Sequence, residues 1–224
     1  MALILHIDTA LETASVCLSD DENIIALAMN TDQKDHASWL HNSIREMMLR
    51  HGIRLNQLQA ISVSIGPGSY TGLRVGLSAA KGFCYALNIP LITTGTLEMI
   101  ANSVKNIATD LICPLIDARR MEVYSAVYDK LMTELEKPTA MIVDENSFSH
   151  LLTNQKLIFT GSGSKKLQQV LSHTNASFID TVVTAEQLVV FAHLSYRKQQ
   201  FADLAYTEPL YIKDFYSPAR KPLV

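Results

Sequence analysis

One glycine-rich segment constrains the fold of this chain more than any other feature of its sequence. Residues 66–76 read Gly-Pro-Gly-Ser-Tyr-Thr-Gly-Leu-Arg-Val-Gly, and they lie between a predicted strand at 60–65 and a predicted helix at 71–87. A loop that leads from a strand into a helix can present backbone N–H groups to an anion. The segment matches neither a Walker loop, nor a GxGxxG fingerprint, nor a GxSxG nucleophile elbow. The residues therefore leave two interpretations open, a tight turn and a phosphate-binding loop.

The predicted helix that follows is apolar on nearly every side. Gly72, Gly76 and Ala80 recur every four residues and share one face, while Arg74 belongs to a single polar line. Because a glycine inside a helix costs roughly 1 kcal/mol relative to alanine, we expect another backbone to approach this face closely. One side of such a helix can face the chain's own sheet. The other side needs a second layer, from this chain or from another one.

Strand and helix patterns alternate along the chain. A helix is predicted across Leu40 and Ile44 and ends at Gly52, and another begins at Thr184 with a capping box to Gln187. Further strands are predicted at 3–7, 15–19, 24–29, 91–94, 113–117, 122–128 and 156–160. The alternation favours a layered α/β fold. The 224 residues suffice for one domain or for two lobes of about 100 residues each.

The charge balance argues against a stand-alone nucleic-acid-binding protein. The formal net charge is −3, whereas such proteins are usually basic because phosphate contacts supply most of their affinity. Arg220 and Lys221 offer either a local RNA contact or a solvated tail.

The cysteines and the apolar segments indicate a soluble protein of a reducing compartment. Cys17, Cys84 and Cys113 lie in separate apolar runs without CxxC spacing. This pattern predicts buried free thiols in the cytoplasm rather than disulfides or a zinc site. The apolar start of the chain, residues 1–8, is too short to cross a membrane, and nowhere do 18 apolar residues run together.

The histidines predict neither a metal site nor a peptidase site. His36 and His41 are five residues apart, so they do not share a helix face as a zinc pair at i and i+4 would. No HExxH motif occurs, and the remaining histidines are isolated in the sequence. We expect no metal constellation and no pair of nucleophile and base.

Four segments resemble the TsaB (YeaZ) family of glycoprotease-like proteins. The main one runs from Ile61 through the glycine-rich motif and Pro90 to Gly95. The others are Ile-Asp-Thr-Ala at 7–10, His-Ala-Ser at 36–38, and Asp-Ala-Arg-Arg-Met-Glu-Val-Tyr at 117–124. The resemblance spans most of the chain, is strong only before about residue 130, and is carried above all by the motif at 66–76.

The resemblance implies an α/β protein with the actin-like ATPase (ASKHA) fold, in which two lobes each contain a mixed sheet and flanking helices. The lobes are expected at 1–105 and 106–224. In function it implies a non-catalytic, cytoplasmic partner of the paralogous catalytic subunit TsaD. With the ATPase TsaE, which joins through the complex of this chain with TsaD, the assembly transfers a threonylcarbamoyl group to a tRNA adenosine beside the anticodon. The chain is expected to meet tRNA only through this complex and to have no membrane contact.

The resemblance also implies that the first helix and the glycine-rich helix contact TsaD, which would supply the missing second layer. The residues expected at this contact are His36, Leu40, Ile44, Gly72, Arg74, Gly76 and Ala80. The sequence leaves open whether the isolated chain forms a homodimer.

The resemblance also identifies a reduced nucleotide site. Actin-like ATPases hold a metal–nucleotide with two acidic phosphate loops and a glycine-rich adenosine loop. Asp8 stands at the first phosphate position, and Gly161 and Gly163 resemble the adenosine loop. Asp117 matches the second position, but it is followed by Ala-Arg where glycines are expected. We expect no required cofactor, and at most weak binding of ATP and magnesium or a nucleotide at the partner interface. Asp8 is equally well explained as a turn residue at a strand end.

Two other functions remain as alternatives. The first is a self-sufficient ATPase or phosphotransferase of the same fold. The second is the older family label of a glycoprotease, similar to an O-sialoglycoprotein endopeptidase. The glycine-poor loop at Asp117 and the absence of a metal-binding histidine pair favour the partner protein over both.

Overall fold

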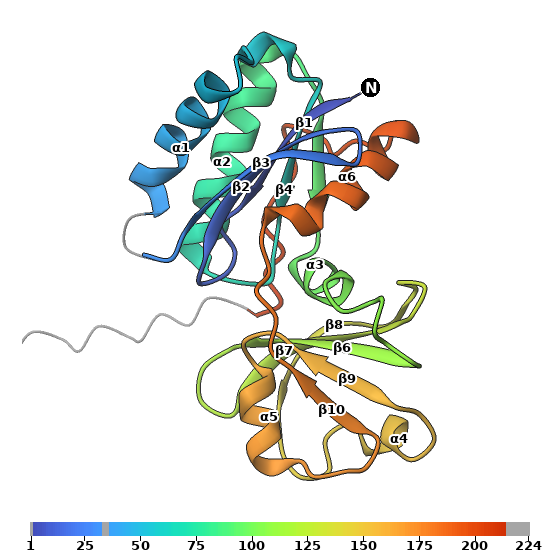
Figure 1. Cartoon of the computed structure of the whole chain (residues 1–224). Coiled ribbons are helices and arrows are strands. Elements are labelled where there is room, and N and C mark those ends of the chain that lie inside the picture. The colour runs from blue at the N-terminus through green and yellow to red at the C-terminus, as the bar shows by residue number, and fades with distance from the viewer. Residues whose placement is uncertain (1, 33–35, 214–224) are drawn as a thin grey trace, which may run out of the picture.

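The computed structural model describes residues 2–32 and 36–213, which form two lobes stacked end to end (Figure 1). The first lobe contains a five-stranded sheet in the order β3-β2-β1-β4-β5. Its strands are β1 (Leu3–Asp8), β2 (Ala14–Asp20), β3 (Asn23–Asn30), β4 (Ala60–Ser64) and β5 (Leu91–Thr94). β1, β2 and β3 pair antiparallel, and β4 and β5 continue the sheet in parallel to β1.

Helices cover both faces of this sheet. The helices α1 (His36–Arg50) and α2 (Tyr70–Leu87) lie on one face, and α6 (Leu188–Arg197) lies on the other (Figure 1). Alternate residues of the central strand face opposite sides. Leu5 and Ile7 therefore pack in the core beneath α1 and α2, whereas Ile4 packs with Ala192 of α6.

The second lobe repeats the topology of the first. Its sheet has the order β10-β9-β6-β7-β8, again with an antiparallel three-stranded meander extended by two parallel strands. The strands are β6 (Leu111–Asp117), β7 (Glu122–Asp129), β8 (Glu134–Ile142), β9 (Leu157–Thr160) and β10 (Ala176–Ile179). Short helices α4 (Ser149–Leu152) and α5 (Ser164–Val170) accompany it. The expected class, two lobes with mixed sheets and flanking helices, is confirmed, although the sequence shows no repeat.

A hydrophobic cluster joins the lobes. It is built around α3 (Thr96–Asn102), which contributes Leu97 and Ile100, and it includes Cys17 of β2 and Ile112 of β6. The 3-10 helix η3 (Ala185–Gln187) adds Ala185, whose N–H donates to Ser15 Oγ at 2.8 Å. Residues far apart in the sequence thus form one core between the two sheets.

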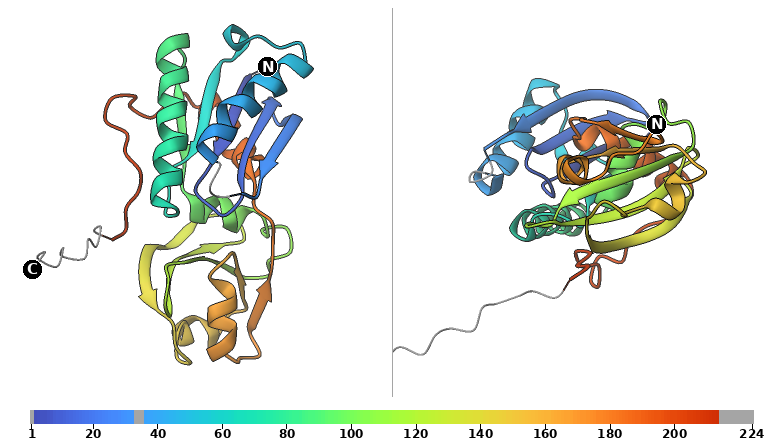
Figure 2. Two further views of the ribbon diagram at one scale, coloured as in Figure 1. Left: turned by 90° about the vertical axis from the view of Figure 1, so that its left-hand side faces the viewer. Right: turned by 90° about the horizontal axis from the view of Figure 1, so that it is seen from below.

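The chain returns to the first lobe after the second sheet. Beyond α6, Ala202 N donates to Leu91 O at 2.8 Å, and Leu210 N donates to Ile65 O at 2.7 Å. Figure 2 shows this segment running alongside α2. A domain boundary near residue 105 stays a proposal. The last strand of the first sheet ends at Thr94, and the second sheet begins at Leu111.

Most predicted elements are present within one or two residues of their predicted ends. The capping box of Thr184 and Gln187 is confirmed, although the first turn is 3-10. Six elements were not predicted: the 3-10 helix η2 (Leu55–Gln57), α3, β8, α4, α5 and β10. The predicted tail contact of Arg220 and Lys221 lies outside the described residues.

The three cysteines are free and buried, as predicted. Burial raises the pKa of Cys17 to about 12 and that of Cys84 to about 11, so neither is a thiolate near neutral pH. Among the described residues, no helix has both the length and the apolar character needed to cross a membrane.

Candidate functional site

The glycine-rich segment closes over the end of β1. Glycine is needed at positions 68 and 72. A Cβ at Gly68 would collide with the carbonyl oxygen of Ala10, and a Cβ at Gly72 would collide with the carbonyl oxygen of Thr9. Two hydrogen bonds fix the contact: Ser69 N donates to Ala10 O at 2.8 Å, and Thr9 Oγ1 donates to Gly72 O at 2.6 Å. The loop is therefore a close junction between β1 and α2, with the backbone of this same chain as the approaching element.

Asp8 is fully buried beneath this junction. Its Oδ1 accepts hydrogen bonds from Ser64 Oγ at 2.5 Å and from Ala10 N at 3.1 Å. Its Oδ2 has no hydrogen-bond partner among the described residues. Burial raises the pKa of Asp8 to about 6, although the hydrogen bonds from Ser64 and Ala10 act in the opposite direction. The side chain expected at the first phosphate position is thus occupied inside the protein.

The face of α2 predicted to meet a partner lies in the chain's own core. Gly76 is buried, and a Cβ there would collide with Thr9 Oγ1 and lie 3.6 Å from Ile7 Cγ2. Ala80 is also buried. The expected close approach of a backbone is present, and it comes from this chain itself. Gly72, Gly76 and Ala80 are buried against it, and their part in a partner contact stays a prediction.

The predicted contact residues of α1 include two that are buried in the same core. Leu40 and Ile44 belong to the core between the helices and the sheet and are almost completely buried, and their part in a partner contact stays a prediction. His36 is the first residue of α1, and its side chain lies outside the described part. The helical spacing of Leu40 and Ile44 correctly predicted an apolar face, and that face packs against the chain's own sheet.

Arg74 is the predicted contact residue that is exposed. Its guanidinium carbon lies 4.0 Å from the centre of the Tyr70 ring, and its Nε donates to Tyr211 Oη at 3.0 Å. The rings of Tyr70 and Tyr211 lie 5.4 Å apart. Arg74 thus connects the first turn of α2 to the returning C-terminal segment.

We define the α1–α2 face as the outward residues of these two helices. Its exposed members include Ala37, Ser38, His41, Asn42, Arg45, Leu49, Thr71, Arg74, Ser78, Gly82 and Tyr85. The His41 and Phe83 rings, 5.8 Å apart, hold the helices side by side. Leu49 and Tyr85 are large apolar or aromatic side chains left in solvent. The sequence pattern did not single out Tyr85 as an exposed aromatic residue.

In the second lobe, Gly161 and Gly163 pack against β6. Gly161 has φ 91°, and a Cβ there would lie 2.5 Å from Leu115 O. A Cβ at Gly163 would lie 3.0 Å from Val123 Cγ1, and Gly163 N donates to Leu115 O at 2.9 Å. Asp8 contacts β4 of the first lobe, so the three predicted nucleotide residues are each packed within their own lobe. Nucleotide binding by them stays a prediction.

Asp117 ends β6 and is exposed, and its carboxylate is bonded to other residues of the second lobe. Its Oδ1 accepts from Lys166 Nζ at 2.7 Å and from Arg119 N at 2.6 Å, while its own N–H donates to Ser162 Oγ at 3.1 Å. Both acidic positions of the predicted phosphate loops therefore already have protein donors. In the described part of the chain, no three His, Cys, Asp or Glu side chains could together hold a metal ion.

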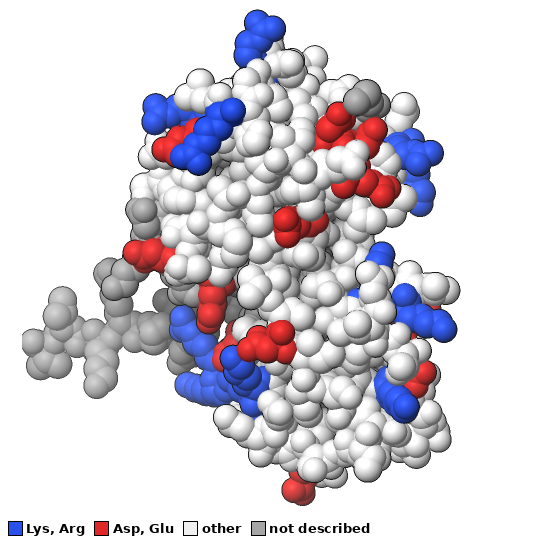
Figure 3. All heavy atoms as spheres, in the orientation of Figure 1, with Lys and Arg blue, Asp and Glu red and all other residues white. Residues whose placement is uncertain are grey.

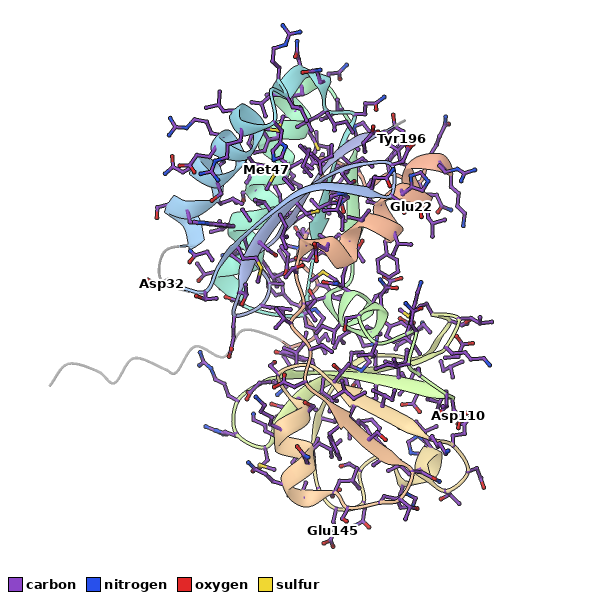
Figure 4. The ribbon with its side chains drawn as sticks, in the orientation of Figure 1. Glu22, Asp32, Met47, Asp110, Glu145 and Tyr196 are labelled. Carbon is purple, nitrogen blue, oxygen red and sulfur yellow. The ribbon has the colours of Figure 1, made fainter. Side chains whose placement is uncertain are left out.

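Two surface cavities lie away from these acidic positions. One of about 590 Å³ lies between the β2–β3 turn and the C-terminal end of α6, and Figure 4 labels Glu22 and Tyr196 on its lining. His193 borders it and lies 3.8 Å from Asp21 Oδ1 and 3.7 Å from Glu22 Oε1. The other, of about 370 Å³, is lined by residues of β3, α3, η3 and α6. Neither cavity includes Asp8 or Asp117.

These features define a two-lobed α/β protein in which Asp8 lies buried beneath the junction of β1 and α2. A family model described as TsaD, tRNA N6-adenosine threonylcarbamoyltransferase, matches residues 30–214. The chain belongs to this family, and its relatives within the family are the TsaB (YeaZ) proteins, as its motifs indicated.

Several relatives carry the name tRNA threonylcarbamoyladenosine biosynthesis protein TsaB, three of which are described here. That of Bacillus subtilis is 32% identical over 143 residues, 64% of this chain and 61% of the relative. That of Escherichia coli is 34% identical over 129 residues, 57% of this chain and 55% of the relative. The chain thus spans less than two thirds of these two relatives. That of Haemophilus influenzae is 25% identical and is matched over 93% of its length and 94% of this chain.

The solved structures agree on the fold. YeaZ from Pseudomonas aeruginosa superposes with a TM-score of 0.82 over 94% of this chain and 100% of that chain, at 22% identity. A second Pseudomonas aeruginosa structure, described as similar to peptidase YEAZ, gives a TM-score of 0.84 at 21% identity and covers 95% of this chain and 100% of that one.

Proposed function

We propose that this chain is a non-catalytic subunit in the biosynthesis of threonylcarbamoyladenosine in tRNA, and that it binds and activates the catalytic paralogue TsaD. The names of its relatives and of the matching family model support this pathway. TsaE joins through the complex of this chain with TsaD, and tRNA is bound by the assembled complex. This role fits a protein that works in the cytoplasm.

The closed junction at Asp8 is the observation that supports a non-catalytic role most strongly. A nucleotide-hydrolysing enzyme of this architecture needs a carboxylate and backbone N–H groups that face a metal–phosphate. Here the Asp8 carboxylate is buried and bonded to Ser64, and the start of α2 packs directly on Thr9 and Ala10. Opening this junction would break the contact between β1 and α2. We therefore propose that the chain needs no cofactor of its own and binds nucleotide weakly or not at all.

The α1–α2 face is the surface that we propose for TsaD. Leu49 and Tyr85 are exposed on two helices held together by the core beneath them. Exposed aromatic and apolar side chains on a rigid base are the usual anchors of protein interfaces. The partner contact thus uses the outward residues of α1 and α2, not the glycine face.

Two titrations test the proposal. TsaD is titrated into the purified chain in a calorimeter, and magnesium with ATP is titrated into the chain alone. We expect saturable binding of TsaD and no saturable binding of nucleotide. Micromolar affinity for ATP that disappears in Asp8→Ala, together with ATP turnover by the chain alone, would instead support the ATPase alternative.

A further inference from the structure

The hairpin between β6 and β7 carries two arginines in an unusual backbone conformation. Arg119 and Arg120 have φ 68° and φ 50°, in the left-handed region that glycine, asparagine and aspartate adopt most easily. Arginine is disfavoured there because its Cβ crowds the backbone. A turn of this shape would form more easily with smaller residues, so its two arginines call for an explanation beyond the turn itself.

Hydrogen bonds hold the hairpin in this conformation. Asp117 Oδ1 accepts from Arg119 N at 2.6 Å. Across the turn, Ala118 N donates to Glu122 O at 3.0 Å, and Glu122 N donates to Arg119 O at 3.1 Å. Lys166 Nζ, bonded to Asp117, also donates to Glu122 O at 3.3 Å. The two guanidinium groups are therefore presented from a fixed base.

The two arginines at the tip are not paired with the acidic side chains of the hairpin. Both acidic side chains of the hairpin have other cations as partners, since Asp117 pairs with Lys166 at 2.7 Å and Glu122 pairs with Lys213. Arg119 and Arg120 are exposed, and within residues 2–32 and 36–213 neither forms an ion pair. Figure 3 shows basic side chains gathered with acidic ones at the left-hand edge where the lobes meet. The tip offers two free guanidinium groups to an external anion.

We propose that Arg119 and Arg120 bind the phosphodiester backbone of the RNA substrate within the complex. Guanidinium groups match phosphate oxygens with paired hydrogen bonds and stay charged at any physiological pH. Contacts to the backbone position an RNA without reading its sequence, which suits a subunit that does no chemistry. With a net charge of −3 the chain lacks a general field for RNA, so a local contact has to supply the attraction. The inference rests on the proposed function, because the RNA is the tRNA that the complex modifies.

The test measures RNA affinity of the assembled complex of this chain with TsaD. The probe is a fluorescein-labelled tRNA transcript, followed by anisotropy between about 50 and 200 mM KCl, a range in which phosphate contacts weaken strongly. The variant is Arg119→Gln/Arg120→Gln. The matched control is Arg197→Gln/Lys198→Gln. It removes the same charge from two consecutive exposed basic residues at the end of α6, in the first lobe.

We expect the hairpin variant to bind the transcript about tenfold more weakly at the lower salt concentration. Its plot of log affinity against log salt should also become shallower by about 1.4 to 1.8, the loss of two phosphate contacts. The control should keep wild-type affinity and slope. A second variant, Arg119→Gly/Arg120→Gly, should lose RNA affinity equally while melting no lower than wild type, because glycine suits the turn. A loss of RNA affinity without a loss of thermal stability distinguishes an RNA contact from a structural role.

Several outcomes would overturn the inference. These are an unchanged RNA affinity, an equal loss in the control, or a loss of TsaD binding by the hairpin variant before RNA is added, which would mean that the arginines contact the partner protein. A loss of ATP binding with RNA affinity intact would mean that they hold a nucleotide phosphate. If the wild-type chain does not bind TsaD, the proposed function fails and this inference fails with it. If the wild-type complex forms but the hairpin variant has normal RNA affinity, only this inference fails.

Discussion

The carbonyl oxygen of Thr9 occupies the space that a side chain at Gly72 would need, well inside 3.0 Å of where its Cβ would stand. This relationship joins the end of β1 to the first turn of α2. Close packing of α2 on Thr9 explains why Gly72 and Gly76 occur inside a helix, where glycine is otherwise disfavoured. Asp8, the residue before Thr9, is fully buried beneath this junction.

Replacing Gly76 should destabilise the isolated chain. A leucine there would be driven into Thr9 and Ile7, and overpacking of this kind costs roughly 1–3 kcal/mol or more. Urea unfolding of Gly76→Leu measures the change. Gly82→Ala is the matched control, since Gly82 is on the exposed side of the same helix with nothing within 4 Å of an added Cβ. It should stabilise the chain by about 0.5–1 kcal/mol. Equal stabilities of the two variants would contradict the assignment of the glycine face to the core.

Asp8 should make stability depend on pH between about 4 and 6. Its pKa is raised to about 6 in the folded protein, so the folded state binds a proton more tightly than the unfolded state does. The contribution is therefore most favourable below the unfolded pKa and is lost as the pH rises through about 6, by an amount of about 1–3 kcal/mol.

The Asp8→Asn variant isolates this effect. Buried His6 acts with the opposite sign, because its pKa is lowered to about 3 and its contribution is lost as the pH falls below about 6.5. The comparison of Asp8→Asn with wild type cancels His6. Unfolding free energies measured from pH 4.5 to 7.5 should differ increasingly in favour of the variant up to about pH 6–7 and then stay constant. Parallel curves for the two proteins would show that Asp8 does not titrate as described.

Tyr85 should contribute to the binding of TsaD without supporting the fold. Its side chain is 83% exposed on the α1–α2 face. Truncation of an aromatic interface anchor typically costs about 2 kcal/mol, so Tyr85→Ala should weaken binding by about tenfold or more. Leu131→Ala serves as the control, since Leu131 is 80% exposed in the turn between β7 and β8. Both variants should melt like wild type. A loss of affinity in the control but not in Tyr85→Ala would place the interface elsewhere.

Replacing both hairpin arginines by glycine should stabilise the second lobe. The left-handed backbone conformation costs a residue with a Cβ roughly 1–2 kcal/mol, and glycine avoids this cost. Part of the gain is offset because glycine loses more conformational entropy when the chain folds. We expect a net gain of about 1 kcal/mol for Arg119→Gly/Arg120→Gly in denaturant unfolding. A clear loss of stability would mean that the arginine side chains themselves support the hairpin.

The sequence predicted the strands and helices whose patterns are strong. β1 and β4 are buried apolar runs, and α2 follows a strand through a loop rich in glycine. β8 escaped prediction because it is a half-exposed edge strand with charged residues and Pro138, which strand patterns disfavour. α3 escaped because it has seven residues and is buried on most sides between the lobes, so it lacks a polar face.

The site was predicted less well, because its decisive contacts are long-range. The spacing of Gly72 and Gly76 correctly indicated the close approach of a backbone, but it could not show that the approaching residue is Thr9, more than 60 residues earlier. Leu40 and Ile44 show an apolar stripe, and a stripe alone does not say whether it faces the chain's own sheet or a partner. The strand-end position of Asp8 was visible in the sequence, whereas its bond to Ser64 was not.

Whether the chain is a non-catalytic partner that TsaD requires is decided by measuring threonylcarbamoyladenosine in tRNA by mass spectrometry after reaction with defined subunits. The reaction contains TsaD, TsaE, ATP, a threonylcarbamoyl donor and a tRNA transcript, with this chain present, absent, or replaced by Asp8→Asn. We predict product only when the chain is present, comparable product with Asp8→Asn, and none from the chain without TsaD. Product formed by the chain without TsaD, or undiminished product when the chain is omitted, would contradict the claim that it is a non-catalytic partner required by TsaD.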